Sequence, residues 1–398
     1  MKTNISYERY QRQVILKGFG EAGQQKLLQA KVLVIGAGGL GCPALQYLAA
    51  AGVGTIGIVD DDVISLSNLH RQVLYATDDI GYSKVEVAVS KLWRLNPEVR
   101  INPYKIRLEN SNALGILKQY DWVIDGTDNF ASRYMINDAC FLLNKPLIYG
   151  AVSQYEGQVT IFNPHPLKGN ERGVNYRDLF PTPPKDGEVL NCAEAGVLGV
   201  LPGIIGTMQA AEAIKLITGI GTPLINKLLT YNVLTNEIYE VDLTASASGK
   251  ELLPKTEAAF LAMSYKDECR AKQSSVVEID AEEFNKLRKK TSSVVIDVRE
   301  KGELPLITNF DHQQIPMSVF KEPILNIKAD TIILFCQHGV RSLHAAKMVH
   351  DVFGTSKEVY SLKGGVVKWG DKLGVRILTH ETGSIQSSKE NLPEPPAS

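Results

Sequence analysis

Short apolar runs alternate with segments of helical periodicity between residues 30 and 150. The runs that predict buried strands are Val32–Ile35, Thr55–Val59, Val99–Lys105, Trp122–Asp125 and Pro146–Tyr149. Between them, segments such as Lys84–Leu95 and Ala131–Leu143 place apolar residues at the spacing of a helix. Strands and helices that alternate in this way favour an α/β fold with a doubly wound, mainly parallel sheet.

The pattern changes after residue 150. We expect an antiparallel strand over Gln154–Asn163 and a long polar loop over Asn163–Glu188. An amphipathic helix over Gly206–Thr218 and a hairpin over Leu228–Val241 should follow. The small polar residues of Thr244–Lys250 are typical of a domain boundary. The first domain is therefore expected over residues 1–245, followed by a linker over residues 246–275.

A second alternation begins near Val276. It predicts strands at Val294–Asp297 and Thr331–Phe335 and a helix at Ser342–Phe353. These elements make a smaller α/β domain over residues 276–378. The remaining residues, 379–398, are rich in Ser, Glu and Pro, a composition that predicts disorder.

One uncharged stretch, Val32–Val59, is longer than the roughly 20 residues of a membrane-spanning helix. Seven glycines and Pro43 interrupt it, so we interpret it as a strand, a helix over Pro43–Ala51 and a second strand. The charged segment Met1–Arg12 lacks the apolar core of a signal peptide. The chain is expected to be cytoplasmic.

Composition narrows the possible partners. The 398 residues allow two or three domains, and 43 basic against 44 acidic residues give a net charge of −1. No excess charge indicates nucleic acid or an anionic membrane as the partner. Five cysteines are too few and too scattered for a disulfide framework, which favours a reducing compartment.

The first candidate site is a glycine-rich turn between a predicted strand and a predicted helix. It contains Gly36, Gly38, Gly39 and Gly41, and Asp60 ends the next strand. Glycines let the backbone approach a polyphosphate, the helix N-terminus offers free N–H donors, and the acid can accept a ribose hydroxyl. This arrangement predicts a nucleotide site, but it does not choose between NAD and ATP.

Four residues downstream favour a triphosphate with a metal. Arg71 and Lys84 offer cations, Asn68 offers an uncharged donor, and Asp128 at the end of another strand offers a carboxylate for a divalent ion. A nicotinamide dinucleotide carries less charge and needs fewer such groups.

Four segments together resemble the E1-like activating enzymes of sulfur-carrier proteins, the MoeB and ThiF group. They are Tyr7–Gln13, the glycine turn, Ser65–Gln72 and Thr127–Asn129. The resemblance covers about residues 5 to 245. It implies a Rossmann-like domain that uses ATP and Mg²⁺ to adenylate the C-terminal glycine of a small ubiquitin-like protein.

The resemblance also implies roles for individual residues. Asp60 would hold the ribose, Asn68, Arg71 and Lys84 the phosphates, and Asp128 the Mg²⁺, with Asn129 in the same motif. Arg12 would reach the phosphates bound by a neighbouring subunit, which implies a homodimer.

The cysteines of this domain are expected to have different roles. Cys42 and Cys140 lie in apolar helical segments and are interpreted as packing residues. Cys192 follows the proline-rich loop. The resemblance implies that it can form a covalent link with the carrier, and the alternative is a small residue at a helix start.

Many members of the group also hold a structural zinc with two Cys-x-x-Cys pairs. Here Asn175 and Asp178 stand where the first pair is expected, and Cys269 stands alone near the second. One thiolate cannot make a tetrahedral zinc site. We therefore predict that zinc is absent and that residues 163–190 are more mobile.

The second candidate site begins at Cys336, between a predicted strand and a predicted helix. Backbone N–H groups, the helix N-terminus and Arg341 all favour a thiolate there. The pattern Cys-x-x-Gly-x-Arg-Ser, with Ile296–Arg299 upstream and Leu362–Gly365 and Trp369 downstream, resembles rhodanese domains over about residues 276 to 375. This resemblance implies a persulfide on Cys336. Residues 301–314 match the rhodanese pattern poorly.

Together the two sites predict adenylation of a carrier, attack on the adenylate by the Cys336 persulfide, and reductive release of a thiocarboxylate, with Cys192 as a candidate reductant. The pairing of domains resembles fused MoeB–rhodanese proteins, and this resemblance implies a MoaD-like carrier for molybdopterin synthesis and a cysteine desulfurase as the type of upstream sulfur donor. The alternatives are a ThiS-like carrier for thiamin synthesis or another thiolation route, a pure binding scaffold, and an NAD-dependent oxidoreductase fused to a sulfur-sensing module.

Overall fold

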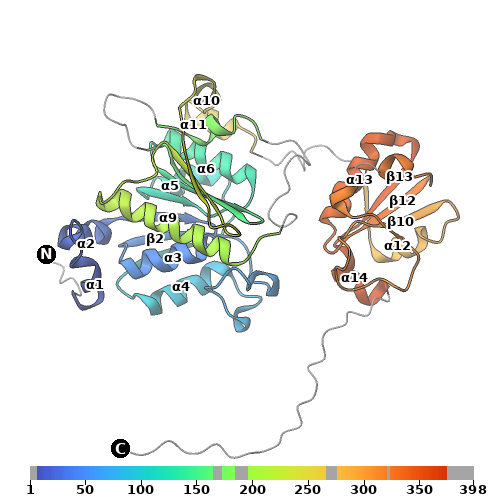
Figure 1. Ribbon diagram of the computed structural model, residues 1–398, viewed down its shortest axis with the longest axis horizontal. Helices are drawn as coiled ribbons and strands as arrows, with labels where there is room; N and C mark the ends of the chain where they lie inside the picture. The colour runs from blue at the N-terminus through green and yellow to red at the C-terminus, as the bar shows by residue number, and fades with distance from the viewer. Residues whose placement is uncertain (1–6, 165–172, 184–195, 266–275, 321–322, 374–398) are drawn as a thin grey trace, which may run out of the picture. The chain divides into compact units, whose positions relative to one another are not determined.

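The computed structural model describes residues 7–164, 173–183, 196–265, 276–320 and 323–373. The chain divides into two compact units, Met1–Ala271 and Lys272–Ser398. Figure 1 shows the elements of both units.

The first unit is built on an eight-stranded sheet in the order β3-β2-β1-β4-β5-β6-β7-β8. Strands β1 to β5 are parallel, and β5 to β8 are antiparallel. Their bounds are Lys31–Ile35, Thr55–Val59, Arg100–Tyr104, Trp122–Asp125, Leu147–Ser153, Glu156–Phe162, Lys227–Asn232 and Ile238–Asp242. All the strands predicted for this domain are confirmed within a few residues of their bounds.

Helices cover both faces of this sheet, which explains why its central strands are apolar throughout. On β1, Val32 and Val34 pack into one buried cluster, and Leu33 and Ile35 pack into another on the opposite face. The helices are α1 (Tyr7–Val14), α2 (Gly20–Gln29), α3 (Gly41–Ala51), α4 (Lys84–Leu95), α5 (Asn110–Leu117), α6 (Phe130–Leu142), α7 (Tyr176–Leu179), α9 (Val200–Thr218), α10 (Ala247–Glu251) and α11 (Glu257–Ala262), with 3₁₀ turns at Leu66–Asn68 and Thr77–Asp79.

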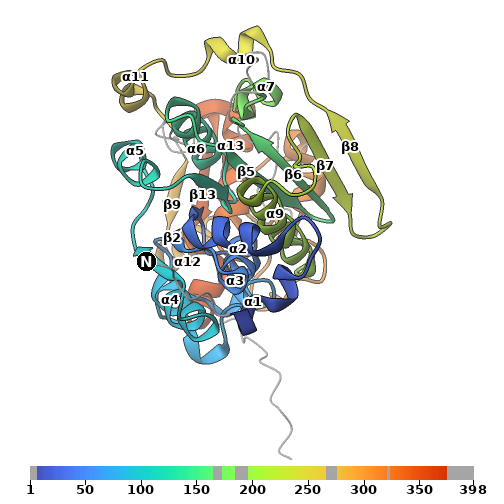
Figure 2. The ribbon, with the colours of Figure 1, turned by 90° about the vertical axis from the view of Figure 1, so that its left-hand side faces the viewer.

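Helix α9 begins at Val200, six residues before its predicted start at Gly206. Pro202 lies in its first turn, where the missing N–H breaks no helical hydrogen bond. Length and composition alone would allow α9 to cross a membrane, but half of it is buried within the unit. It packs against α2, α3, β5 and β6 as a core helix, as Figure 2 shows.

The segment predicted as a linker contains α10 and α11, which pack on the first unit. Phe260 is fully buried in the cluster that includes α5 and α6. Tyr265 donates a hydrogen bond to Asp138 Oδ2 at 2.9 Å, and Asn110 Nδ2 donates to the carbonyl of Leu261 at 3.0 Å. The structure therefore differs from the prediction for residues 246–265, whereas residues 266–275 lie outside the described part.

The second unit contains a parallel five-stranded sheet in the order β11-β10-β12-β13-β9. The predicted strands at 294–297 and 331–335 are confirmed. The strands β9 to β13 are Val277–Ile279, Ser293–Asp297, Gln313–Gln314, Thr331–Phe335 and Glu358–Leu362, and the helices are α12 (Ala281–Leu287), α13 (Val340–Phe353) and α14 (Gly365–Leu373), with 3₁₀ turns at Met317–Val319, Pro323–Asn326 and Gly354–Ser356. The central strand β12 is buried along its whole length.

Candidate active site

The glycine turn lies between β1 and α3 and permits a very close approach of two backbone segments. Gly36 has a φ of +93°, and a Cβ there would lie 2.7 Å from the carbonyl oxygen of Gly126. A Cβ on Gly41 would lie 1.8 Å from the carbonyl oxygen of Gly36. A side chain at Gly36 would push the turn away from the loop that follows β4, and one at Gly41 would collide with the turn itself.

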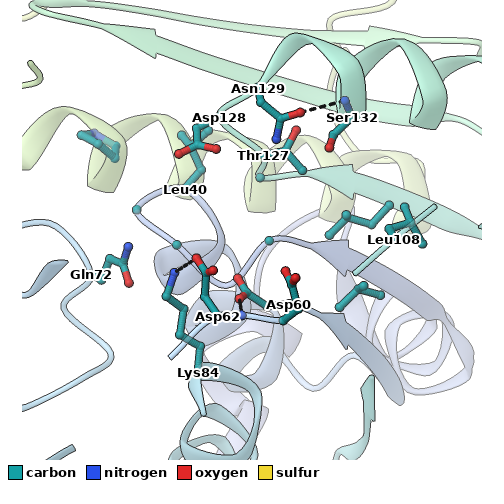
Figure 3. A pocket seen from close by; sticks show the side chains of 18 of the residues that line it. Leu40, Asp60, Asp62, Gln72, Lys84, Leu108, Thr127, Asp128, Asn129 and Ser132 are labelled. Atoms are coloured by element: carbon teal, nitrogen blue, oxygen red, sulfur yellow. Dashed lines mark hydrogen bonds and ion pairs between the residues drawn. The ribbon is translucent and has the colours of Figure 1, made fainter. Parts of the chain in front are cut away.

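A cavity of about 330 Å³ lies beside this turn. Loops that follow β1, β2 and β4 contribute to it, at the point where connections leave the sheet in opposite directions. Figure 3 shows Asp128 and Asn129 on one side and Asp60, Asp62 and Lys84 on the other. Among the predicted residues, those that line the cavity are Gly36, Gly38, Gly39, Asp60, Arg71, Lys84, Asp128 and Asn129.

Asp60 braces the glycine turn. Its Oδ2 accepts the N–H of Ala37 at 2.8 Å, and its Oδ1 accepts the N–H of Asp62 at 2.9 Å. Burial raises the pKa of Asp60, although the Lys84 ammonium and the two N–H groups oppose that change. Lys84, only 5% exposed, donates to Asp62 Oδ2 at 2.7 Å.

Asp128 is the carboxylate in the cavity best suited to a divalent ion. Its side chain is exposed, and no hydrogen bond or ion pair with the described residues engages it. Asn129 has a structural role as the N-cap of α6, because its Oδ1 accepts the N–H of Ser132 at 2.9 Å. The carboxylates of Asp60, Asp61 and Asp62 also lie within 4.8 Å of one another, but Asp62 is already paired with Lys84.

The remaining predicted residues of this site lie elsewhere. Gly41 serves the packing of the turn and does not line the cavity. Asn68 also does not line it, and its Oδ1 accepts the N–H of Ser65 at 3.2 Å. Arg12 is exposed on α1, outside the cavity lining of its own chain.

Among the polar lining residues that the sequence did not point to, Gln72 and Arg133 are buried. Gln72 lines the cavity at 3% exposure, and its Oε1 has no hydrogen-bond partner among the described residues. Arg133 also lines it and donates to the carbonyl of Thr127 at 3.3 Å. Gln72 ends a motif that was already identified, whereas Arg133 lies one helical turn after Asn129 and carried no separate signal.

The cysteines of the first unit fall into two groups. Cys42 and Cys140 are completely buried, and burial raises the pKa of both, that of Cys42 to about 12. Both therefore fit the predicted packing role. Cys192, the candidate for a covalent link, lies outside the described residues.

Asn175 and Asp178, the positions discussed for zinc, take part in a hydrogen-bonded junction. Asp178 Oδ2 accepts the N–H and the side-chain amide of Asn175 at 2.8 and 2.7 Å. Its Oδ1 accepts the N–H and hydroxyl of Ser246 at 2.9 and 3.1 Å. The carboxylate thus joins α7 to the start of α10, while Cys269 and part of residues 163–190 lie outside the description.

Cys336 lies in the second unit, in the turn between β12 and α13. It is 1% exposed, and its Sγ accepts the N–H of Gly339 at 3.1 Å and of Ser342 at 3.4 Å. Gly339 reaches this geometry with a φ of +87°, and the Ser342 hydroxyl donates to the Gly339 carbonyl at 3.1 Å. The turn therefore cradles a sulfur atom with backbone donors, as the sequence predicted.

Arg341 does not donate to the sulfur of Cys336 in the described structure. Its Nη1 and Nη2 donate to Glu303 Oε1 and Oε2 at 2.5 and 2.7 Å. This pairing raises the pKa of Arg341 despite its partial burial. Glu303 belongs to the stretch that matches the rhodanese pattern poorly, and the sequence analysis did not identify it.

Comparison with known proteins assigns each unit to a family. Residues 10–252 match the ThiF family, and residues 280–372 match the rhodanese-like domain. The probable adenylyltransferase/sulfurtransferase MoeZ of Mycobacterium tuberculosis is 41% identical over 369 residues, which cover 92% of this chain and 93% of MoeZ. A sulfur carrier protein adenylyltransferase of Thermus thermophilus is 53% identical over 232 residues, 58% of this chain and 85% of that protein.

Solved structures support the fold of the first unit. The crystal structure of Escherichia coli MccB with MccA-N7isoASN has a TM-score of 0.54 and 24% sequence identity. It covers 61% of this chain and 74% of MccB.

Proposed function

This chain belongs to the ThiF family and carries a rhodanese-like domain, and from that premise we propose that it adenylates the C-terminal glycine of a ubiquitin-like sulfur-carrier protein and converts it to a thiocarboxylate. ATP supplies the adenylyl group, and a persulfide on Cys336 supplies the sulfur. The observation that carries this proposal is the cavity that gathers Asp60, Arg71, Lys84 and Asp128 beside the glycine turn.

Adenylation joins a carboxylate oxygen of the carrier to the α-phosphorus of ATP and breaks the bond to pyrophosphate. The carboxylate is ionised near pH 7, so the step needs no general base. Arg71 and Lys84 offset the negative charge that gathers on the phosphates. Lys84 can do so while it contacts Asp62, because an ammonium has three donors. Asp60 would accept a ribose hydroxyl.

Mg²⁺ fits this cavity, because the uncommitted carboxylate of Asp128 provides the oxygen ligand that the ion prefers. When bound, the ion would neutralise phosphate charge. Arg12 is exposed on α1, and we propose that it reaches the cavity of a second copy in a homodimer.

The sulfur step begins with attack of the outer persulfide sulfur on the acyl carbon of the adenylate, and AMP leaves as the carbon–oxygen bond breaks. The product is an acyl disulfide with Cys336. A thiol then supplies the two electrons that release the thiocarboxylate and leaves Cys336 in a disulfide with that thiol. We retain Cys192 as a candidate for this thiol and a cysteine desulfurase as the type of sulfur donor.

A Cys336→Ala variant separates the two activities. With ATP, Mg²⁺ and a candidate carrier, it should exchange labelled pyrophosphate into ATP at the wild-type rate, because the adenylation cavity is intact. It should form no thiocarboxylate from its own persulfide, as measured by the mass of the carrier. Full thiocarboxylate yield without another sulfur donor would contradict the proposed series of steps.

Assays with purified carrier proteins identify the pathway that this enzyme serves. We favour a MoaD-like carrier of molybdopterin synthesis over a ThiS-like carrier, and the carrier that gains first an AMP and then a sulfur-for-oxygen mass change is the substrate. Binding of NADH without binding of ATP would instead support an oxidoreductase.

A further inference from the structure

The turn that holds Cys336 contains a single guanidinium, that of Arg341, and Glu303 engages both of its terminal nitrogens. Two parallel hydrogen bonds of 2.5 and 2.7 Å join the two side chains, which are 20% and 28% exposed. Glu303 lies 38 residues before Arg341, in the connection from β10 to β11. Such a two-bond fork occupies the Nη1–Nη2 edge, one of the two edges of the guanidinium that can bind an oxyanion, and it also neutralises the positive charge.

The second guanidinium near this turn is also paired with a carboxylate. Arg299, 2% exposed, donates to Asp297 through Nε at 3.0 Å and through Nη2 at 2.7 Å. Its Nη1 contacts Gln337 Oε1 at 3.3 Å. Both guanidinium groups are thus paired with carboxylates, and the hydrogen bonds that the Cys336 sulfur accepts from the described residues come from the neutral N–H groups of Gly339 and Ser342.

This charge balance distinguishes between classes of sulfur donor. Thiosulfate is a small dianion, and it would have to displace Glu303 from Arg341 or bind beside an ion pair that offers no net positive charge. The outer sulfur of a thiol persulfide carries at most one negative charge, which the backbone donors can accommodate. The pair therefore disfavours an inorganic oxyanion far more than a persulfide.

We propose that Glu303 is a specificity-determining residue that neutralises Arg341, so that Cys336 takes sulfur from a thiol persulfide and discriminates against inorganic oxyanions such as thiosulfate. This inference rests on the proposed sulfur-carrying role of Cys336. With a persulfide, the Cys336 thiolate attacks the outer sulfur, the sulfur–sulfur bond of the donor breaks, and the donor leaves as a thiolate. With thiosulfate, the same attack releases sulfite, and neither route changes the net oxidation state.

The test is the full-length Glu303→Gln variant, which removes the charge but keeps the size and a hydrogen-bonding oxygen. Cyanide accepts the sulfur in both assays, with thiosulfate or glutathione persulfide as the donor. For thiosulfate, kcat/KM should rise at least about tenfold, because Arg341 gains a free face for the oxyanion. For glutathione persulfide it should change less than about twofold, because that route uses the backbone donors.

Two further variants show whether Arg341 mediates the effect. Glu300 lies nearby, but its carboxylate accepts the N–H and hydroxyl of Ser318 at 3.1 and 2.9 Å. Glu300→Gln therefore removes an equal charge without freeing Arg341. It should leave the ratio of the kcat/KM values for thiosulfate and glutathione persulfide unchanged. Adding Arg341→Ala to Glu303→Gln should abolish the gain with thiosulfate.

Mass spectrometry of Cys336 in the same samples separates the possible failures. A persulfide that forms with both donors, with an unchanged ratio of their kcat/KM values in Glu303→Gln, overturns this inference alone. An equal rise for both donors does the same, because it indicates a general effect on the thiol. No persulfide on Cys336 with either donor overturns its proposed sulfur-carrying role and this inference with it.

Discussion

Ionisation of Glu303 makes its contribution to the stability of the folded state depend on pH. Burial opposes its ionisation, but hydrogen bonds from Arg341 and from the Glu300 N–H outweigh burial and lower the pKa of Glu303. A lowered folded-state pKa means that the carboxylate stabilises the folded state above the unfolded-state value, about 4.3. That contribution is lost as the pH falls through the folded-state pKa.

We expect Glu303→Gln to lower the temperature of one unfolding transition at pH 7. The difference from wild type should shrink below about pH 4.3 and vanish below the folded-state pKa, because both side chains are then neutral. Calorimetry of both proteins from pH 7 to pH 3 measures this difference. A constant difference over the whole range would show that the ionised carboxylate is not the stabilising group.

Individual residues show where sequence reasoning succeeds and where it stops. Asp60 and Asp128 could be predicted because each lies shortly after the end of a parallel strand, and such ends meet at one edge of the sheet. The contact between Glu303 and Arg341 could not be predicted, because it joins a side chain in an irregular connection to a residue 38 positions away. The uncommitted amide oxygen of Gln72 is likewise a property of packing, which no local pattern encodes.

Among the structural elements, the junction of α7 and α10 depends on one carboxylate. Asp178 accepts four hydrogen bonds from Asn175 and Ser246. Asp178→Ala should destabilise the first unit by about 2 to 3 kcal/mol, because it leaves several donors without their acceptor. Urea unfolding measures the loss, and amide exchange over residues 247–251 should rise more than exchange over α3.

The matched control is Asp178→Asn, which keeps an acceptor oxygen and should lose less stability than the alanine variant. Equal losses would show that charge, rather than the number of hydrogen bonds, holds the junction. Unchanged amide exchange over α10 in the Asp178→Ala variant would contradict the role of this junction.

The elements themselves were predictable to different degrees for a physical reason. Strands such as β2 and β4 matched their predicted bounds, because an apolar run between charged or turn-forming residues has clear ends. The short helices α10 and α11 were missed, because each buries few side chains and so shows little periodicity. Burial of Phe260, the strongest anchor of α11, depends on a surface supplied by α5 and α6.

At the scale of the whole molecule, the exposed position of Arg12 leads to a prediction about subunits. If Arg12 completes the cavity of a second copy, Arg12→Ala and Asp128→Ala damage opposite contributors to one site. Each variant alone should be nearly inactive in pyrophosphate exchange. Mixed and allowed to reassort, they should recover about a quarter of wild-type activity, because half of the dimers are mixed and each mixed dimer has one intact site.

A mixture of either variant with the double variant Arg12→Ala/Asp128→Ala is the control, since no dimer in it contains an intact site. Recovery in the first mixture but not in the control supports a shared site. No recovery, with subunit exchange verified by mass spectrometry, would place Arg12 within its own chain or outside the reaction.

The pairing of Glu303 with Arg341 also bears on how this protein can evolve. Sulfur transfer rests on Cys336 and backbone donors, whereas donor choice rests on a side chain in a separate connection. The codons for Glu and Gln differ by one base. A single nucleotide change is therefore enough to alter which sulfur donors the enzyme accepts, while its nucleophile stays the same. Selection can therefore act on the source of sulfur and on the chemistry of its delivery as independent traits.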